Sequence, residues 1–222
     1  METLGPILAV VAVLALIAGI VMLSYRIERK RTEALAAACQ GMGLTFEPEG
    51  DLEALRAQGD LPLFNHGHSK KLKNVISGQV RDRDLRLFDY QYTTGGGKNS
   101  HTWKQTVALF PRAGERLPEL LLAPENLFHK IGQVFGYQDI DFDTSPDFSS
   151  HYLLRGPDEM AIRSAMSADA LSFFGQHQGW HVEVKDRTVG IYRAGKRCQP
   201  EDAPTFLAEV QDVLRVLVHG LT

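Results

Sequence analysis

The sequence predicts an α+β protein, in which one N-terminal transmembrane helix precedes an antiparallel β meander and a β hairpin packed with helices. Three observations support this prediction. Residues 4–25 form an uncharged apolar run, residues 74–110 are rich in β-branched and aromatic side chains, and residues 201–218 carry an apolar stripe at helical spacing. The 222 residues suffice for a domain of about 190 residues behind the apolar run.

The apolar run is long enough to span a membrane. As a helix, its roughly 22 residues extend about 33 Å, against a hydrocarbon core of about 30 Å. A cleavable signal peptide would begin with positive charge and end at small residues, whereas this chain begins with Met1 and Glu2 and continues into Tyr25 and Arg26. We therefore expect residues 1–25 to be a transmembrane helix. Its anchor residues are Leu4, Ile7, Leu8, Val11, Leu14, Ile17, Val21 and Leu23.

The charges beside the run predict its orientation. Lysine and arginine follow the run and none precedes it, so the positive-inside rule places the short N-terminus outside and the domain in the cytoplasm. This predicts a single-pass signal anchor in the cell inner membrane. Cys39 and Cys198 form no CxxC pair, which agrees with a cytoplasmic domain. The topology-setting residues are Arg26, Arg29, Lys30 and Arg31.

The rest of the chain divides into three segments. Residues 26–43 predict a juxtamembrane amphipathic helix, because apolar residues from Leu35 to Met42 recur at helical spacing. This helix would continue the span without a flexible linker. A β-rich half over residues 44–148 and an α+β half over residues 149–222 follow. We expect them to pack as one compact domain over residues 32–222.

Each half has its own predicted elements. In the β-rich half we expect strands over 44–46, 74–80, 85–92 and 101–110, a helix capped by Asp51 and ending at Arg56, and turns over 111–149 with one short helix near 125–132. In the α+β half we expect a strand over 152–154, helices over 158–166, 168–177 (capped by Ser167) and 201–218, and a hairpin of strands 180–185 and 188–193.

The acidic segment from Asp139 to Asp143 is similar to the start of a calcium-binding loop. Such a loop needs glycine at its sixth position and glutamate at its twelfth, where this chain has Thr144 and Ser150. We therefore expect a strand in which Ile140 and Phe142 are buried and the carboxylates point outward.

Other motifs also lack parts that their chemistry requires. His66 and His68 have no third zinc ligand at a recognised spacing. Residues 92–99 contain a Gly-Lys pair but lack the upstream glycine and the following Ser or Thr of a phosphate loop, so a hairpin tip is the better interpretation. Cys198 has no identifiable base, although Lys196 and Arg197 precede it. We expect no cofactor and no bound metal.

A basic stretch suggests a lipid or partner surface. If the tether holds it near the membrane, each Lys or Arg there gains about 1 kcal/mol from anionic lipid. The alternative is a solvated sheet edge protected by charge. The mildly acidic composition, with a formal net charge of −3, argues against nucleic-acid binding. The stretch comprises Lys70, Lys71, Lys73, Arg81, Arg83 and Arg86.

Several segments resemble a group of uncharacterised bacterial single-pass membrane-anchored proteins with no assigned function. The resemblance covers most of residues 26–218 and implies no activity, so no functional residue is carried over from it. The segments are Asn74–Gly78, Phe88–Tyr92, Leu117 and Pro118 with Leu122, Pro124 and Glu125, Gly136–Asp143, and Tyr152–Gly156 with Asp158 and Glu159.

The leading functional hypothesis is a non-enzymatic, membrane-tethered cytoplasmic module that binds a protein partner or the inner leaflet. A second hypothesis is an enzyme of unrecognised type, and a third is a ligand sensor with an apolar cavity inside the sheet. The polar site of the enzyme would use Asp139, Asp141, His129, His151, Arg155 or Glu159.

Overall fold

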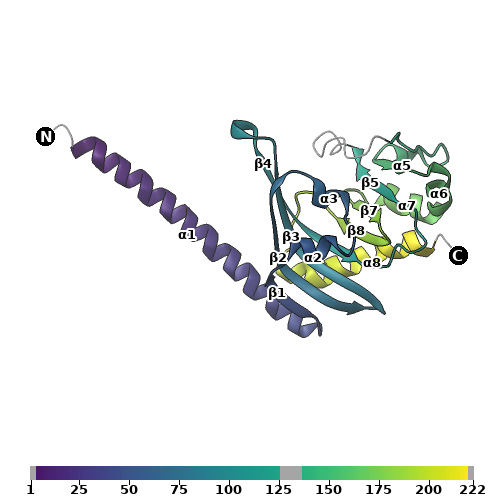
Figure 1. Ribbon diagram of the computed structural model, residues 1–222, viewed down its shortest axis with the longest axis horizontal. Helices are drawn as coiled ribbons and strands as arrows, with labels where there is room; N and C mark the ends of the chain where they lie inside the picture. Colours follow the sequence, from purple (N-terminus) through teal and green to yellow (C-terminus); the bar gives the residue numbers. More distant parts are fainter. Residues whose placement is uncertain (1–3, 126–136, 220–222) are drawn as a thin grey trace.

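A long N-terminal helix projects from a folded α+β body (Figure 1). The computed structural model describes residues 4–125 and 137–219. Helix α1 (Leu4–Gly41) is unbroken over 38 residues, and it is long and apolar enough to cross a membrane. For Leu4 and Ile7 only the backbone is described. The anchor residues whose side chains are described are all more than half exposed: Leu8, Val11, Leu14, Ile17, Val21 and Leu23.

Within the described residues, eight strands form an antiparallel sheet, which confirms the predicted α+β fold class. The strand order is β1-β2-β3-β4-β8-β7-β5-β6, so the meander β1–β4 joins the hairpin β7–β8 through β4 and β8. The strands are β1 (Thr45–Glu49), β2 (His68–Val80), β3 (Arg83–Thr94), β4 (His101–Phe110), β5 (Leu120–Pro124), β6 (Tyr152–Arg155), β7 (His181–Lys185) and β8 (Thr188–Tyr192).

Among the described residues, the helices that follow α1 range from the four residues of α3 to the 17 residues of α8. Asp51 caps α2 by accepting from the Glu53 amide at 2.9 Å, and Ser167 caps α7 by accepting from the Ala170 amide at 3.2 Å, as predicted. The helices after α1 are α2 (Leu52–Arg56), α3 (Pro62–Asn65), α5 (Pro146–Ser149), α6 (Glu159–Ala165), α7 (Ala168–Gln176) and α8 (Ala203–His219), with 3₁₀ turns η1 (Gly97–Asn99) and η2 (Pro200–Asp202).

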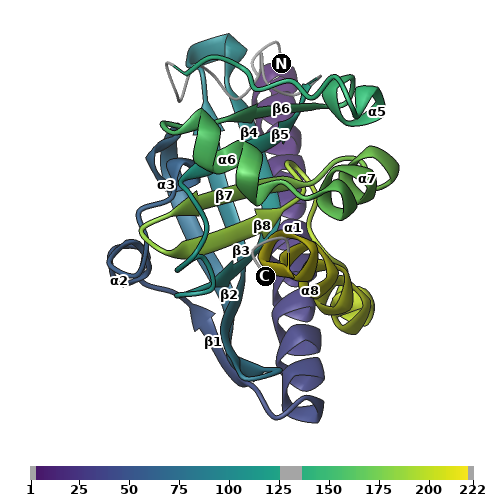
Figure 2. The same ribbon diagram turned by 90° about the vertical axis from the view of Figure 1, so that its right-hand side faces the viewer.

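The sheet carries an apolar layer on each face. Helix α8 and the second half of α1 lie on one side of the sheet, and α2 and α3 lie on the other (Figure 2). On the α1 side, Leu35 and Cys39 of α1 join the core that Val210 and Val213 of α8 form with the sheet. On the opposite side, Phe64 of α3 packs in the second core cluster. The apolar stripe predicted for the last helix is therefore confirmed.

Strand β2 contains a bulge that matters for the site described below. Lys73 pairs with Asp89 and Ile76 pairs with Leu87, so β2 has one more residue than β3 between these two pairs. Asn74 occupies the bulge with φ of 53°, a left-handed conformation that asparagine tolerates better than most residues. The bulge places Asn74 beside Asp89.

One prediction about the middle of the chain is wrong. Residues 120–124 were expected to belong to a turn-rich segment, yet they form β5, which pairs with both β6 and β7. The short apolar run of β5 ends at Pro124 and follows Pro118, and prolines so close together are typical of turns in a sequence. The predicted helix near 125–132 lies almost wholly outside the described residues.

The segment Asp139–Asp143 is not a strand. Ile140 and Phe142 are buried as expected, but the Phe142 amide donates to the Ser149 hydroxyl at 2.9 Å instead of to a neighbouring strand. Asp139 also does not point outward, because its carboxylate accepts from the Leu154 amide at 2.8 Å. Alternation of apolar and acidic residues therefore predicted the burial correctly and the backbone conformation incorrectly.

A buried carboxylate ties α3 to the sheet. Glu183 of β7 accepts hydrogen bonds from the Leu63 amide at 3.0 Å and from the Tyr192 hydroxyl at 2.8 Å. Burial raises the pKa of Glu183 from 4.5 to about 7. The neighbouring His181 ring stacks on Tyr192, and burial lowers the pKa of His181 to about 3.

We predict that Glu183→Gln changes how stability depends on pH. The folded-state pKa of Glu183 lies above its unfolded value, so its contribution is fully present below about pH 4.5 and is lost as pH rises through about 7. The stability of the wild type relative to the variant should therefore fall by up to about 3 kcal/mol across this window. Urea unfolding followed by fluorescence of the buried Trp103 and Trp180 measures it, and a pH-independent difference would contradict the assignment.

Candidate functional site

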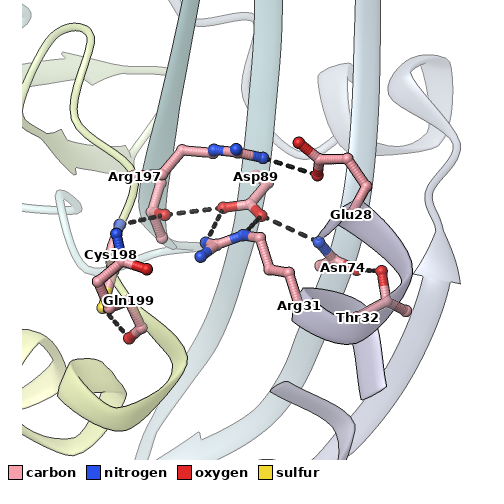
Figure 3. Close-up of polar contacts among 9 residues, drawn as sticks. Glu28, Arg31, Thr32, Asn74, Asp89, Arg197, Cys198 and Gln199 are labelled. Atoms are coloured by element: carbon pink, nitrogen blue, oxygen red, sulfur yellow. Dashed lines mark hydrogen bonds and ion pairs between the residues drawn. The ribbon is translucent and has the colours of Figure 1, made fainter. Parts of the chain in front are cut away.

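The second half of α1 is fixed to the sheet by a buried ion pair. The Arg31 guanidinium donates to both carboxylate oxygens of Asp89 on β3, from Nε at 2.8 Å and from Nη2 at 2.9 Å (Figure 3). Both side chains are only 8% exposed. A two-point contact of this kind fixes both the distance and the orientation of the two groups.

The remaining acceptor positions of Asp89 are also occupied. The Asn74 amide donates to one oxygen at 2.9 Å, and the Thr106 hydroxyl donates to the other at 2.8 Å. Four hydrogen bonds therefore satisfy this buried carboxylate, which removes most of the cost of holding it away from water. The bulge in β2 is what brings Asn74 into this arrangement.

The same cluster extends to the loop after β8. The Thr106 hydroxyl accepts from the Cys198 amide at 2.9 Å, and the Thr106 amide donates to the Lys196 carbonyl at 3.1 Å. Burial raises the pKa of the Cys198 thiol to about 11. This is opposite to the lowered pKa that a nucleophilic cysteine needs, so Cys198 has a structural environment.

Two further contacts flank the ion pair along α1. The Arg197 guanidinium donates from Nη1 to Glu28 at 2.8 Å, and the Thr32 hydroxyl donates to the Asn74 carbonyl oxygen at 2.8 Å. The hydrogen bond from Arg197 lowers the pKa of Glu28. Residues 28, 31 and 32 share one face of a helix, so one stripe of α1 holds β2, β3 and the loop after β8 together.

A recess of about 210 Å³ opens beside these contacts, between α1 and the sheet. Strand pairing places lysines along it, because Lys71 and Lys104 both pair with Gln91 and Lys73 pairs with Asp89. In the part of the chain that the structure describes, these three lysines have no acidic partner within ion-pair distance. The charged residues that line the recess are Glu28, Lys71, Lys73, Asp89, Lys104 and Arg197.

The predicted basic stretch does not form one surface. Lys71 and Lys73 line the recess, whereas Lys70 lies on the opposite side of β2 from Lys71 because strand side chains alternate. Arg86 pairs with Ser77 and also lies away from the α1 side. Arg81 and Arg83 lie at the β2–β3 turn, where Arg83 pairs with Val80.

The predicted topology-setting residues also separate in the structure. Arg26, Arg29 and Lys30 are exposed on α1, and Arg29 donates to Glu33 at 2.8 Å on the helix surface. Arg31 is instead buried against Asp89. Sequence reasoning assigned no role to Lys104 and considered Arg197 only as a neighbour of Cys198. The position of Lys104 beside Lys71 depends on strand register, and that of Arg197 depends on the loop after β8; the local sequence pattern indicated neither.

The residues considered for an enzymatic site have local structural contacts. Asp139 accepts from the Leu154 and Ile140 amides, and burial raises its pKa. Glu159 is exposed and pairs with Arg163 at 2.8 Å. The His151 ring bonds the Asp147 carbonyl, Arg155 is half-buried on β6, and the Asp141 side chain is exposed. His129 lies outside the described residues.

The histidine and glycine motifs belong to the β3–β4 hairpin region. His68 Nε2 lies 3.0 Å from the Gly95 carbonyl oxygen, and the His66 ring packs edge-on against Tyr92. Residues 95–100 form the hairpin tip with η1, as interpreted from sequence. Among the described residues, no group of three His, Cys, Asp or Glu side chains could hold a metal ion.

No protein-family model and no curated protein matches this chain. Among solved structures, the crystal structure of the mycobacterial trehalose monomycolate transport factor A, TtfA, is similar with a TM-score of 0.57. The match covers 85% of this chain and 97% of the TtfA chain, at 14% sequence identity. At this identity the likeness shows a shared fold: a TtfA-like α+β fold that here follows a helix apolar enough to cross a membrane.

We predict that Asp89→Asn lowers the free energy of unfolding by about 3–5 kcal/mol, because it leaves the Arg31 charge buried without a counter-ion. Combining it with Arg31→Met should recover part of the loss. Urea unfolding of the full chain in detergent, followed by tryptophan fluorescence, measures both effects. Arg29→Met serves as the control, because the exposed pair with Glu33 should contribute nothing measurable. Equal losses in the single and double variants would contradict the assignment.

Proposed function

We propose that this chain is a single-pass membrane-tethered protein whose domain acts at the cytoplasmic surface of the inner membrane as a non-enzymatic binding module. The observation that carries the proposal is the continuity of α1. Its first half exposes a wholly apolar surface, and its second half is held in the domain by the buried Arg31–Asp89 pair. A helix of this kind would fix the domain rigidly to the bilayer.

The exposed apolar half of α1 supports the tether. Leu8 and Leu23 mark the described ends of a stretch whose large apolar side chains are more than half exposed. In water such a surface is unfavourable, whereas in lipid a helix satisfies its own backbone hydrogen bonds and buries these side chains. The exposed Arg26, Arg29 and Lys30 directly after the run support a cytoplasmic domain by the positive-inside rule.

The geometry of the junction supports a domain that works close to the bilayer. Glu28 follows Tyr25 by three residues, which is about 4.5 Å along a helix. The headgroup layer on each side of a bilayer is about 5–7 Å thick. The β3–β4 hairpin also projects from the same end of the sheet as the N-terminal half of α1 (Figure 2), although its tip stands apart from the helix (Figure 1). Both features would place the recess and the hairpin tip at the level of the lipid headgroups.

The fold suggests the kind of machinery this module serves. TtfA is described as a transport factor for trehalose monomycolate, and its fold covers most of this chain. We propose by analogy that this protein is an accessory subunit of a membrane transport assembly, and that it binds a membrane-protein partner through α1 and the hairpin tip. The analogy extends to the class of role and not to the transported molecule.

The tether predicts how the protein fractionates. The full chain should sediment with membranes, remain there after a carbonate wash and dissolve in detergent, whereas a chain lacking residues 2–25 should be soluble. Protease added to spheroplasts should leave the domain intact, and protease added to inverted vesicles should digest it. Release of the full chain by carbonate would overturn the span, and digestion in spheroplasts would overturn the orientation.

If a membrane protein binds α1 and the hairpin tip, cross-linking in membranes should depend on where the photo-reactive residue is placed. A photo-reactive residue placed at Val21 or at Lys98 in the hairpin tip should form a discrete adduct with a membrane protein. The same residue at Met160, which is 81% exposed on α6 at the far end of the domain from α1, is the matched control and should not (Figure 1). Absence of adducts from Val21 and Lys98, or identical adducts from Met160, would contradict a partner at the membrane-proximal face.

A further inference from the structure

We propose that the recess between α1 and the sheet binds a phosphate-bearing anion, and that Lys71, Lys73 and Lys104 hold its phosphate oxygens. The nearest source of such a group is the headgroup of a phospholipid. This inference deepens the proposed function: the lipid source rests on the tether, whereas binding of phosphate itself does not.

The first argument is charge. The two acidic residues of the recess are already neutralised, Glu28 by Arg197 and Asp89 by Arg31. None of the three lysines forms an ion pair among the described residues, although the charge of Lys104 helps to lower the pKa of Glu28. Four basic side chains face two acidic ones in the lining, so the recess is positively charged. An ammonium group donates three hydrogen bonds and binds phosphate as a point charge, which suits several lysines converging on one anion.

The second argument is that strand register gathers the three lysines on one face of the sheet. Lys71 on β2 and Lys104 on β4 flank Gln91 on either side of β3, and Lys73 follows two residues after Lys71 on the same face. The exposed arginines elsewhere on the chain often have an acidic neighbour, as Arg29 has Glu33 and Arg163 has Glu159. The unpaired lysines of the recess gain their counter-charge from a bound anion.

The third argument is size and position. The recess has a volume of about 210 Å³, whereas pockets that enclose drug-sized ligands have volumes of about 300–1,000 Å³. The recess therefore suits one small anionic group and not a whole lipid. Glu28 lines it, and that residue lies within the headgroup layer when α1 crosses a bilayer. A headgroup phosphate could therefore enter while its acyl chains stay in the membrane beside α1.

The chain supplies a matched pair of variants for the test. The recess variant is Lys71→Gln/Lys73→Gln/Lys104→Gln. The control variant is Lys70→Gln/Arg81→Gln/Arg83→Gln, which removes the same charge from the opposite side of β2 and from the β2–β3 turn. Full-length proteins are purified in maltoside, a detergent without phosphate. Native mass spectrometry then measures the affinity for phosphatidylglycerol, and calorimetry measures the affinity for inorganic phosphate and for glycerol 3-phosphate.

The proposal expects the recess variant to bind phosphatidylglycerol at least about tenfold more weakly than the wild type, because it loses charge-assisted hydrogen bonds. The control variant should bind as the wild type does. Lipid binding without binding of the soluble anions identifies a membrane lipid as the source. Binding of the soluble anions alone, lost in the recess variant, identifies a free phosphoester and leaves the site assignment intact.

Three outcomes would overturn the site. These are no binding of any phosphate probe to the wild type, equal losses in the two triple variants, and unchanged binding in the recess variant. Lys104→Glu alone provides a second variant if the triple change impairs folding, and it should weaken binding in the same direction. A full chain that fractionates as soluble would refute the tether, yet the calorimetric measurement would still decide whether the recess binds phosphate.

Discussion

The position of α1 on the domain depends on the buried contact between Arg31 and Asp89. Neither group is tolerable in the interior alone, since an unpaired buried charge costs several kcal/mol. Asp89 is satisfied only when Arg31, Asn74 and Thr106 all reach it, and each of these residues comes from a different element. The positions of α1, the β2 bulge and β4 therefore depend on one another, because Asp89 needs a contact from each of them. The neighbouring Glu28–Arg197 contact extends the same requirement to the loop before α8.

The recess is a consequence of this arrangement. Because the contacts are polar, α1 meets this end of the sheet through hydrogen bonds, while its apolar residues Leu35 and Cys39 pack further along the helix. The space beside the contacts is lined by long lysine side chains. The structural role of Asp89 and the binding role proposed for the lysines are thus separable, since the acidic group is already fully engaged by its own partners.

Much of the fold was readable from local sequence. The apolar run, the capping residues Asp51 and Ser167 and the stripe of α8 depend on nearest neighbours along the chain, and the structure contains each of them. The meander and the β7–β8 hairpin were predicted because alternation and turn residues are also local signals. Strand β5 was missed because its five residues end at a proline, and its strand character comes from pairing with β6 and β7.

The site was less predictable, for a physical reason. Arg31 belongs to a basic flank whose composition indicates membrane orientation. Its partner Asp89 is 58 positions away, so the local sequence does not predict the pair. The basic stretch was visible as a run of charge, but only strand register separates Lys71 and Lys73 from Lys70. Lys104 joins them from another strand. The bulge at Asn74 completes the site. It requires a positive φ at Asn74, and the sequence of β2 did not predict this conformation.

The absence of a hinge between residues 4 and 41 has a mechanical consequence. Helices in bilayers lean by about 20° on average, and the lean changes with membrane thickness. In a protein with a loose linker, such tilting would be absorbed before it reached the folded part. If α1 crosses a bilayer as proposed, α1 and the sheet would tilt together as one rigid unit, so thinning or thickening of the bilayer would move the far edge of the sheet and reorient any partner bound there.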